Sequence, residues 1–120
     1  MTKAEQEIMK YLWKLEKAFM KDIVDAFPEP KPAYTTIATV LKRMVEKELI
    51  GFKQYGKVRE YYPKLKKPDY FSGEINHMIK NFFNDSTAQF ASFFTSETDM
   101  SLSELEALKQ MIEKEIQKKK

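Results

Sequence analysis

Apolar residues recur every three or four positions in the first part of the chain, which is the spacing of one face of a helix. Thr2 and Glu5 stand three residues apart, as in a capping box, so the sequence predicts that a helix begins near Lys3. We expect its core face to carry Ala4, Ile8, Leu12 and Leu15.

Two more helices are predicted before residue 50. The first covers residues 20–27, and the proline-rich stretch 28–32 separates it from the second, over residues 33–48. Helical spacing gives this later helix an apolar core face, made of Ile37, Val40, Leu41 and Met44. Its opposite face carries hydroxyl groups and cations, from Thr35, Thr36, Thr39, Lys42 and Arg43.

A β-hairpin is predicted over residues 49–63, where β-branched and aromatic residues surround Gly56. Its tip is short and basic, with Tyr55 and Lys57 at the turn and Arg59 on the returning strand. Three helices followed by a hairpin is the order of a winged helix, in which the helix before the hairpin enters the DNA major groove.

From residue 69 onward the spacing predicts three further helices. Asp85 or Ser86 is expected to cap the second, and Ser101 or Ser103 the third. Six of the nine phenylalanines lie in the range 71–94, more than three short helices can easily bury among themselves. We therefore predict a dimerisation module with contact residues Phe71, Ile75, Ile79, Phe82, Phe83, Phe90, Phe93, Phe94, Leu105, Leu108 and Ile112. The competing interpretation packs these rings onto the first domain.

The predicted fold class is mainly α with a small β-hairpin wing. Residues 1–68 are expected to form an N-terminal winged helix-turn-helix that binds DNA, and residues 69–120 a C-terminal α-helical dimerisation domain. The basic, proline-bounded stretch 64–68 is the predicted junction.

Composition limits the possible functions. The 120 residues are 32% charged and 42% hydrophobic, which is typical of a globular chain. There is no cysteine, and His77 is the single histidine, so we expect no metal, no cofactor and no enzyme. Because no apolar run approaches a membrane span and no signal peptide opens the chain, we expect a cytoplasmic protein without membrane insertion.

Charge is unevenly distributed. Residues 1–68 hold 13 Lys and 2 Arg against 9 acids, a net charge of +6, whereas residues 69–120 carry −3. A basic face suits a phosphate backbone, so we predict contacts to double-stranded DNA from Thr35, Thr36, Thr39, Lys42, Arg43, Tyr55, Lys57 and Arg59. A two-fold homodimer would read a pseudo-palindromic operator. The alternative is an adaptor whose winged helix and aromatic module both bind proteins.

Four stretches of the chain, in order, resemble the penicillinase-repressor family (BlaI/MecI type): Thr2 to Trp13, Tyr34 to Met44, Tyr61 to Pro63, and Leu102 to Leu108. The resemblance covers nearly the whole chain. It implies a homodimeric transcriptional repressor of a β-lactam resistance operon or a related stress operon. It also implies a membrane sensor with a metalloprotease domain, which leads to cleavage of the repressor in its C-terminal module.

The resemblance also bears on single residues. It matches recognition-helix positions of the family to Thr36, Thr39 and Arg43. Ala38 stands where the best-known members carry arginine, which implies a lost DNA contact and a different operator. The family's Asn-Phe cleavage point aligns with Phe93-Phe94, although core or dimer packing is the competing interpretation of these rings. Copper-responsive relatives carry a C-terminal cysteine cluster, which this chain lacks.

Overall fold

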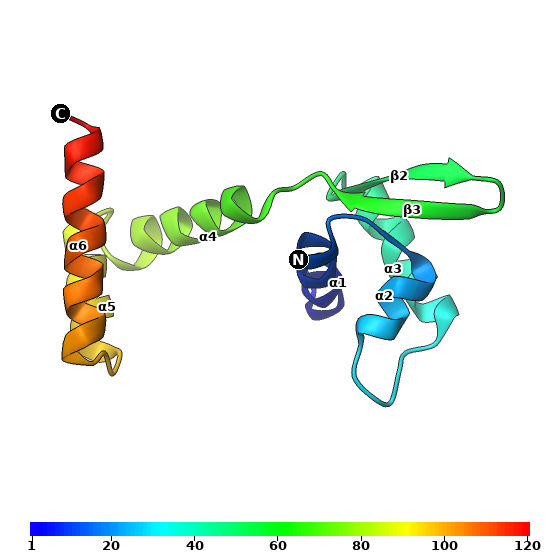
Figure 1. The fold of residues 1–120 in the computed structure, drawn as a ribbon, viewed down its shortest axis with the longest axis horizontal. Helices are drawn as coiled ribbons and strands as arrows, with labels where there is room; N and C mark the ends of the chain where they lie inside the picture. Colours follow the sequence, from blue (N-terminus) through cyan, green and yellow to red (C-terminus); the bar gives the residue numbers. More distant parts are fainter. The chain divides into compact units, whose positions relative to one another are not determined.

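The computed structural model describes all 120 residues (Figure 1). Its elements are α1 (Lys3–Leu15), β1 (Ala18–Phe19), α2 (Met20–Ala26), α3 (Tyr34–Glu46), β2 (Ile50–Tyr55), β3 (Val58–Pro63), α4 (Lys67–Phe82), α5 (Thr87–Glu97) and α6 (Leu102–Lys118). The chain divides into two compact units, Met1–Ser72 and Gly73–Lys120, and the division falls inside α4. The assignment of DNA binding and dimerisation to separate domains stays a prediction.

The first helix begins as predicted, because Thr2 and Glu5 form a complete capping box. The Glu5 amide donates to Thr2 Oγ1 (3.2 Å), and the Thr2 amide donates to Glu5 Oε1 (2.8 Å). Its core face is rotated from the predicted one, since Ala4 and Leu15, expected inside, are exposed. That part of the prediction was wrong because hydrophobic spacing ignores a charged residue in a core position. The buried residues are Glu5, Ile8, Met9 and Leu12.

The predicted hairpin is confirmed, and we call it the wing. β2 and β3 pair antiparallel, and Gly56 occupies the turn with a φ of 60°, where glycine meets no Cβ penalty. β1 adds a third strand in the order β1-β3-β2, with Ala18 opposite Tyr61. The sequence did not predict β1, because two residues carry no alternating pattern.

One hydrophobic core joins the first three helices to the sheet. Its fully buried side chains include Ile8 and Leu12 from α1, Ile23 from α2, Met44 from α3 and Ile50 from β2. Three helices and a wing around one core form the predicted winged helix. Because the inner side of α3 is fixed in this core, its other side faces outward beside the wing (Figure 1).

The beginning of α4 packs within the first unit. The Trp13 indole Nε1 donates to the Leu65 carbonyl (2.9 Å), and the centroid of its ring lies 5.8 Å from that of Tyr70 and 5.9 Å from that of Phe71. Phe71, which the sequence grouped with the dimerisation residues, therefore contacts the winged helix. Its role at a dimer interface stays a prediction.

The second unit comprises the rest of α4 together with α5 and α6. Ser86 caps α5 by accepting from the Gln89 amide (3.1 Å), and Ser101 caps α6 in a capping box with Glu104, as the sequence predicted. Ile79 is the only buried apolar side chain in this unit. In neither unit is any helix both long and apolar enough to span a bilayer.

Candidate nucleic-acid interface

The outer face of α3 carries the predicted hydroxyl groups and cations. All four predicted inner residues of this helix are buried. All five predicted outer residues are exposed, namely Thr35, Thr36, Thr39, Lys42 and Arg43. The sequence pattern therefore identified both faces of this helix correctly.

The hydroxyls on this face differ in what they can offer a ligand. Thr39 Oγ1 donates to the Thr35 carbonyl of its own helix (3.0 Å), so its lone pairs and methyl group remain for contact. Thr35 and Thr36 are exposed and can donate a hydroxyl proton to a phosphate oxygen.

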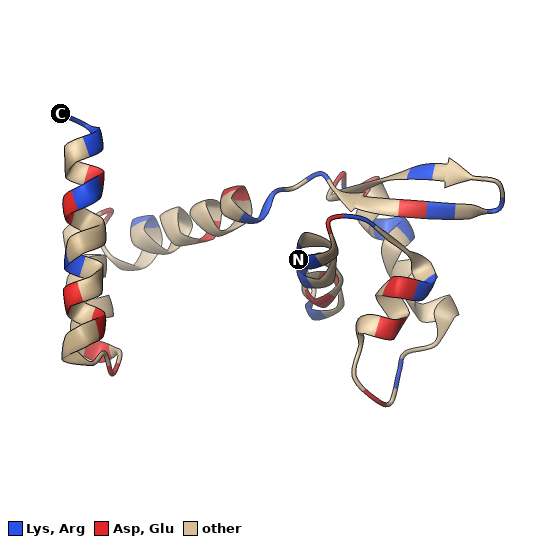
Figure 2. Cartoon of the chain, viewed as in Figure 1, with Lys and Arg blue, Asp and Glu red and all other residues tan.

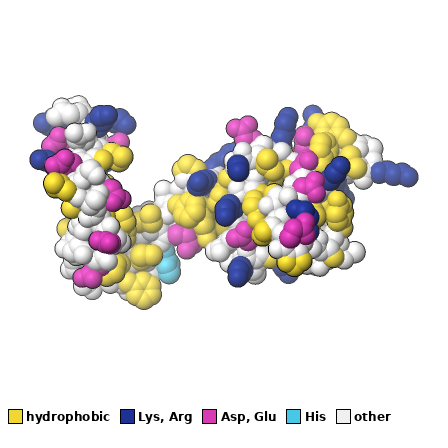
Figure 3. Space-filling model, turned by 60° about the horizontal axis from the view of Figure 1, so that its bottom comes forward, with side chains coloured by type: hydrophobic (Ala, Val, Ile, Leu, Met, Phe, Trp, Pro, Cys, Tyr) yellow, Lys and Arg dark blue, Asp and Glu magenta, His cyan; other side chains and the backbone are white.

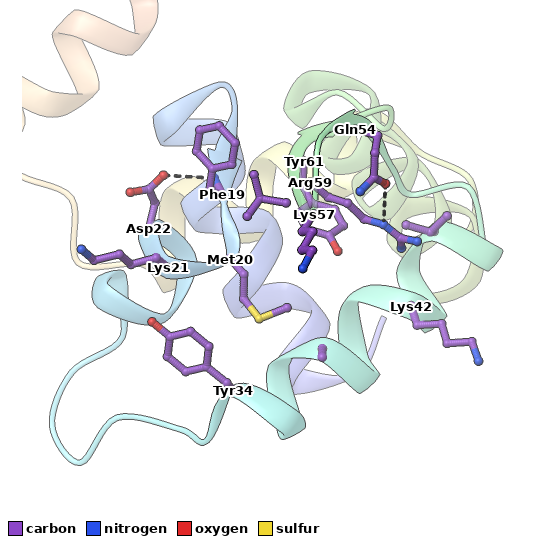
Figure 4. Close-up of a pocket in the computed structure, with 13 residues that line it drawn as sticks. Phe19, Met20, Lys21, Asp22, Tyr34, Lys42, Gln54, Lys57, Arg59 and Tyr61 are labelled. Atoms are coloured by element: carbon purple, nitrogen blue, oxygen red, sulfur yellow. Dashed lines mark hydrogen bonds between the residues drawn. The ribbon is translucent and has the colours of Figure 1, made fainter.

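A groove lies between α3 and the wing (Figure 4). Its walls include Tyr34, Ala38 and Lys42 from α3, and Gln54, Lys57 and Arg59 from the wing. We call it the α3–wing groove. The start of α2 adds Lys21 and one acid, Asp22, so four cations and one carboxylate line the groove. This excess of positive charge attracts a phosphate backbone.

Arg59 is held in place on the inner face of the wing. Its guanidinium carbon lies 4.2 Å from the centroid of the Phe52 ring, and its Nε donates to Gln54 Oε1 (3.2 Å). Gln54 is the register partner of Arg59 across the hairpin, so the two side chains share a face. The guanidinium Nη groups remain available for a ligand in the groove.

Tyr55 does not join the groove residues. It is opposite Val58 in the hairpin register, and although Val58 lines the groove, Tyr55 is not among the lining side chains. Its ring centroid is 6.2 Å from that of Phe19, and Lys53 Nζ lies 5.6 Å above it. Of the predicted wing residues, the structure brings together Lys57 and Arg59 with Lys42 of α3, and leaves Tyr55 outside.

Arg43 is paired with a buried carboxylate that the sequence revealed only as a capping residue. Arg43 Nε lies 3.6 Å from Glu5 Oε2, and Lys47 Nζ lies 2.9 Å from the same oxygen. Burial alone raises the pKa of Glu5, but hydrogen bonds from Thr2 and Lys47 and the charge of Lys47 lower it to about 2. The carboxylate therefore stays ionised beneath the exposed face of α3.

Sequence reasoning missed Tyr34 and Gln54 as groove residues and Glu5 as the partner of Arg43. Gln54 could have been found by pairing it with Arg59 across the predicted hairpin. Tyr34 begins α3, and no sequence pattern places it beside the wing. Figure 2 shows Lys and Arg on α3 and along the wing to its turn. No three His, Cys, Asp or Glu side chains lie close enough together to hold a metal ion.

The second unit exposes much of its apolar surface. The Phe83 ring centroid lies 5.5 Å from that of Phe90 and 5.4 Å from that of Phe93, and Phe94 stacks on Phe90 at 6.1 Å. Leu105 and Leu108 are half-buried. Several other predicted contact residues are exposed, most of all Phe82 at 76%; they include Ile75, Phe93, Phe94 and Ile112. Figure 3 shows hydrophobic side chains on the surface of this unit.

The chain is similar to known repressors. The penicillinase repressor family model matches residues 1–114. The penicillinase repressor of Bacillus licheniformis is 25% identical over 118 residues, which covers 98% of this chain and 92% of that protein. The solution structure of the DNA-binding domain of the repressor BlaI matches with a TM-score of 0.52 and 27% identity, over 58% of this chain and 87% of that one. The CopR repressor structure matches with a TM-score of 0.47 and 28% identity, over 55% of this chain and 97% of that one. The chain belongs to the penicillinase repressor family of transcriptional repressors.

Proposed function

We propose that this repressor acts as a homodimer that binds a pseudo-palindromic DNA operator through α3 and the wing. The observation that carries the proposal is the α3–wing groove, where Lys42 of α3 and Lys57 and Arg59 of the wing line one concavity. The DNA-binding domain named in the BlaI structure supports DNA as the partner. Membership of a repressor family implies a regulator and not an enzyme.

The two elements have different tasks in this proposal. α3 has 13 residues, about 20 Å of helix, and enters the major groove, which is about 12 Å wide. Thr36, Thr39 and Arg43 face base edges, where an arginine can form a bidentate pair with guanine. Lys42, Lys57 and Arg59 neutralise phosphates of the backbone.

The exposed apolar surface of the second unit supports a dimer. A second copy of the chain would cover the aromatic and aliphatic side chains that this unit leaves in solvent, among them Phe82 and Ile112. Two linked winged helices bind two half-sites far more tightly than either alone, so loss of the dimer would release the operator. β-Lactam resistance genes or related stress genes are the proposed targets.

Proteolysis is the proposed route to that loss, with a membrane sensor metalloprotease as the inducer. Phe93 and Phe94 lie inside α5, and their rings pack against Phe83 and Phe90 respectively. Proteases bind extended chain, so cleavage between Phe93 and Phe94 requires local unwinding of α5.

The deciding experiment selects binding sites from random duplex DNA with the full-length protein, then measures affinity for the selected duplex and for a scrambled one. Arg43→Ala is expected to lower affinity for the selected duplex by about 1–3 kcal/mol. The matched control is Lys10→Ala, an exposed cation on α1 outside the groove, which should leave it unchanged. Circular dichroism verifies that both variants fold. If selection enriches no sequence, the operator proposal fails and a protein-binding adaptor takes its place.

A further inference from the structure

Glu5 combines complete burial with a full set of partners. Its side chain is 0% exposed, whereas those of Arg43 and Lys47 are 45% and 47% exposed. Oε1 accepts from the Thr2 amide (2.8 Å) and from Lys47 Nζ (3.2 Å), and Oε2 lies near both cations. Burying a carboxylate is costly unless it is paired in this way. Capping of α1 needs only the Thr2 contact and does not explain the two cations from α3 and its C-terminal end.

The contact between Glu5 and Arg43 involves one particular edge of the guanidinium group. Glu5 Oε2 lies 3.6 Å from Nε, a distance that makes an ion pair and is longer than a hydrogen bond. Nε is one of five N–H donors in the guanidinium, and the other four belong to the two Nη groups. Glu5 is buried, so its carboxylate attracts the guanidinium from the protein side through Nε, and the Nη groups have no hydrogen-bond partner within the chain.

We propose that Glu5 is a positioning residue for DNA recognition, which acts by holding Arg43 in one orientation on the outer face of α3. The inference rests on the proposed function, because it requires Arg43 to contact DNA. A free arginine side chain loses rotamer entropy on binding, and an arginine already held in its bound orientation loses less. Lys47 completes the arrangement by pairing with the same carboxylate.

This role can be distinguished from a purely structural one by the sign of two effects. Removing a negative charge near the backbone reduces repulsion of phosphates, so non-specific DNA affinity should stay constant or rise. Loss of Arg43 orientation should lower affinity for the selected site alone. A structural defect, by contrast, would weaken binding to every duplex together.

The test compares four proteins: wild type, Glu5→Gln, Arg43→Ala and the double variant. The readout is the ratio of affinities for the selected duplex and a scrambled duplex of equal length, at one salt concentration. Arg43→Ala is expected to lower this ratio about 5- to 150-fold. Glu5→Gln should lower it at least about twofold, and the double variant no further than Arg43→Ala. Glu7→Gln, the same chemical change on the same helix, is the matched control and should leave the ratio unaltered.

The outcomes separate the two proposals. If Arg43→Ala leaves the ratio unchanged, the proposed contact of Arg43 with DNA is wrong. If Arg43→Ala lowers it but the loss from Glu5→Gln is absent, or adds fully in the double variant, DNA reading stands and the positioning role of Glu5 is overturned. If Glu5→Gln does not fold, NMR of the two arginine side chains in the wild-type protein tests the positioning role instead. Restricted motion of the Arg43 Nε–H bond supports the proposal, and motion as free as in an unrestrained arginine contradicts it.

Discussion

Each of the chain's two arginines has an orienting neighbour: Glu5 lies beside Arg43, while Phe52 and Gln54 contact Arg59. In both arginines the Nε edge faces a protein group, and the Nη groups have no hydrogen-bond partner within the chain. Lysines such as Lys57 instead present a mobile point charge. If these arginines bind DNA as proposed, the protein groups that hold their Nε edges contribute to binding along with the exposure of the guanidinium.

The pKa of Glu5 predicts how stability responds to acid. Since the folded pKa of about 2 lies below the ordinary 4.5, the ionised form stabilises the fold. Its contribution is fully present above about pH 4.5 and is lost as the pH falls from there toward 2. Urea unfolding of wild type and Glu5→Gln between pH 6 and 2.5 measures this. We expect Glu5→Gln to be less stable at pH 6 by roughly 1–3 kcal/mol, and the gap to narrow in acid. A gap that is constant with pH contradicts the ion-pair interpretation.

Arg59 predicts a change in salt dependence. If its guanidinium neutralises one phosphate, Arg59→Ala should reduce the slope of log affinity against log salt by about 1. Lys109→Ala removes a cation from α6 and is the control, with an unchanged slope. Titrations at several salt concentrations measure both slopes. Equal slopes for Arg59→Ala and wild type would place Arg59 outside the DNA contact.

At the scale of elements, glycines in the wing and in α4 have opposite requirements. Gly56 needs a positive φ at the turn, whereas Gly73 lies in α4, and a Cβ at either would have no atom within 4 Å. Steric contacts of an added Cβ are therefore absent at both positions, so backbone conformation alone decides how a Gly→Ala substitution changes stability.

The same substitution should accordingly change stability in opposite directions. Gly56→Ala is expected to destabilise by about 1 kcal/mol, because alanine is strained at positive φ. Gly73→Ala is expected to stabilise by about 0.5–1 kcal/mol, because alanine favours a helix interior. Thermal unfolding of the two variants side by side tests this pair, and shifts of the same sign would be inconsistent with the assigned conformations.

The elements also show how far the sequence could lead. Spacing and turn chemistry predicted the first three helices, the wing and the caps at Ser86 and Ser101, because those signals are local. The sequence did not predict that Glu5 is buried, because its burial depends on pairing with Lys47, which is 42 residues away in sequence. Tyr55 was grouped with Arg59, although only Arg59 of the two lines the α3–wing groove. The α3–wing groove could not be seen at all, since it exists only when two separate elements pack on one core.

At the scale of the whole molecule, the proposed dimer determines how tightly each chain binds its operator. The half-exposed stripe on α6, including Ile112 and Ile116, and the rings of α4 and α5 lack a cover within the unit. A copy of the chain that buries them also links two DNA-binding heads, so dimerisation and operator affinity should change together.

A charge on that stripe tests the coupling. Ile112→Asp would bury an unpaired carboxylate at the interface, so the variant should sediment as a monomer and lose operator affinity. Gln110→Asp introduces the same charge on the other side of α6 and should remain a dimer. Analytical ultracentrifugation gives the mass of each. A wild type that is monomeric, or an Ile112→Asp variant that stays dimeric, would remove this surface from the interface.

Because Phe93 and Phe94 lie within α5, the rate at which this helix opens would limit cleavage of the peptide bond between them. An enzyme that cuts between them must wait for the helix to open, so at high enzyme concentration the cutting rate should reach a plateau. That plateau would equal the opening rate of α5, a property of the repressor and independent of which protease is added. The lifetime of repression after induction would then be set by the substrate's own fluctuations, and a substitution that stiffens α5 would lengthen it without altering the scissile bond.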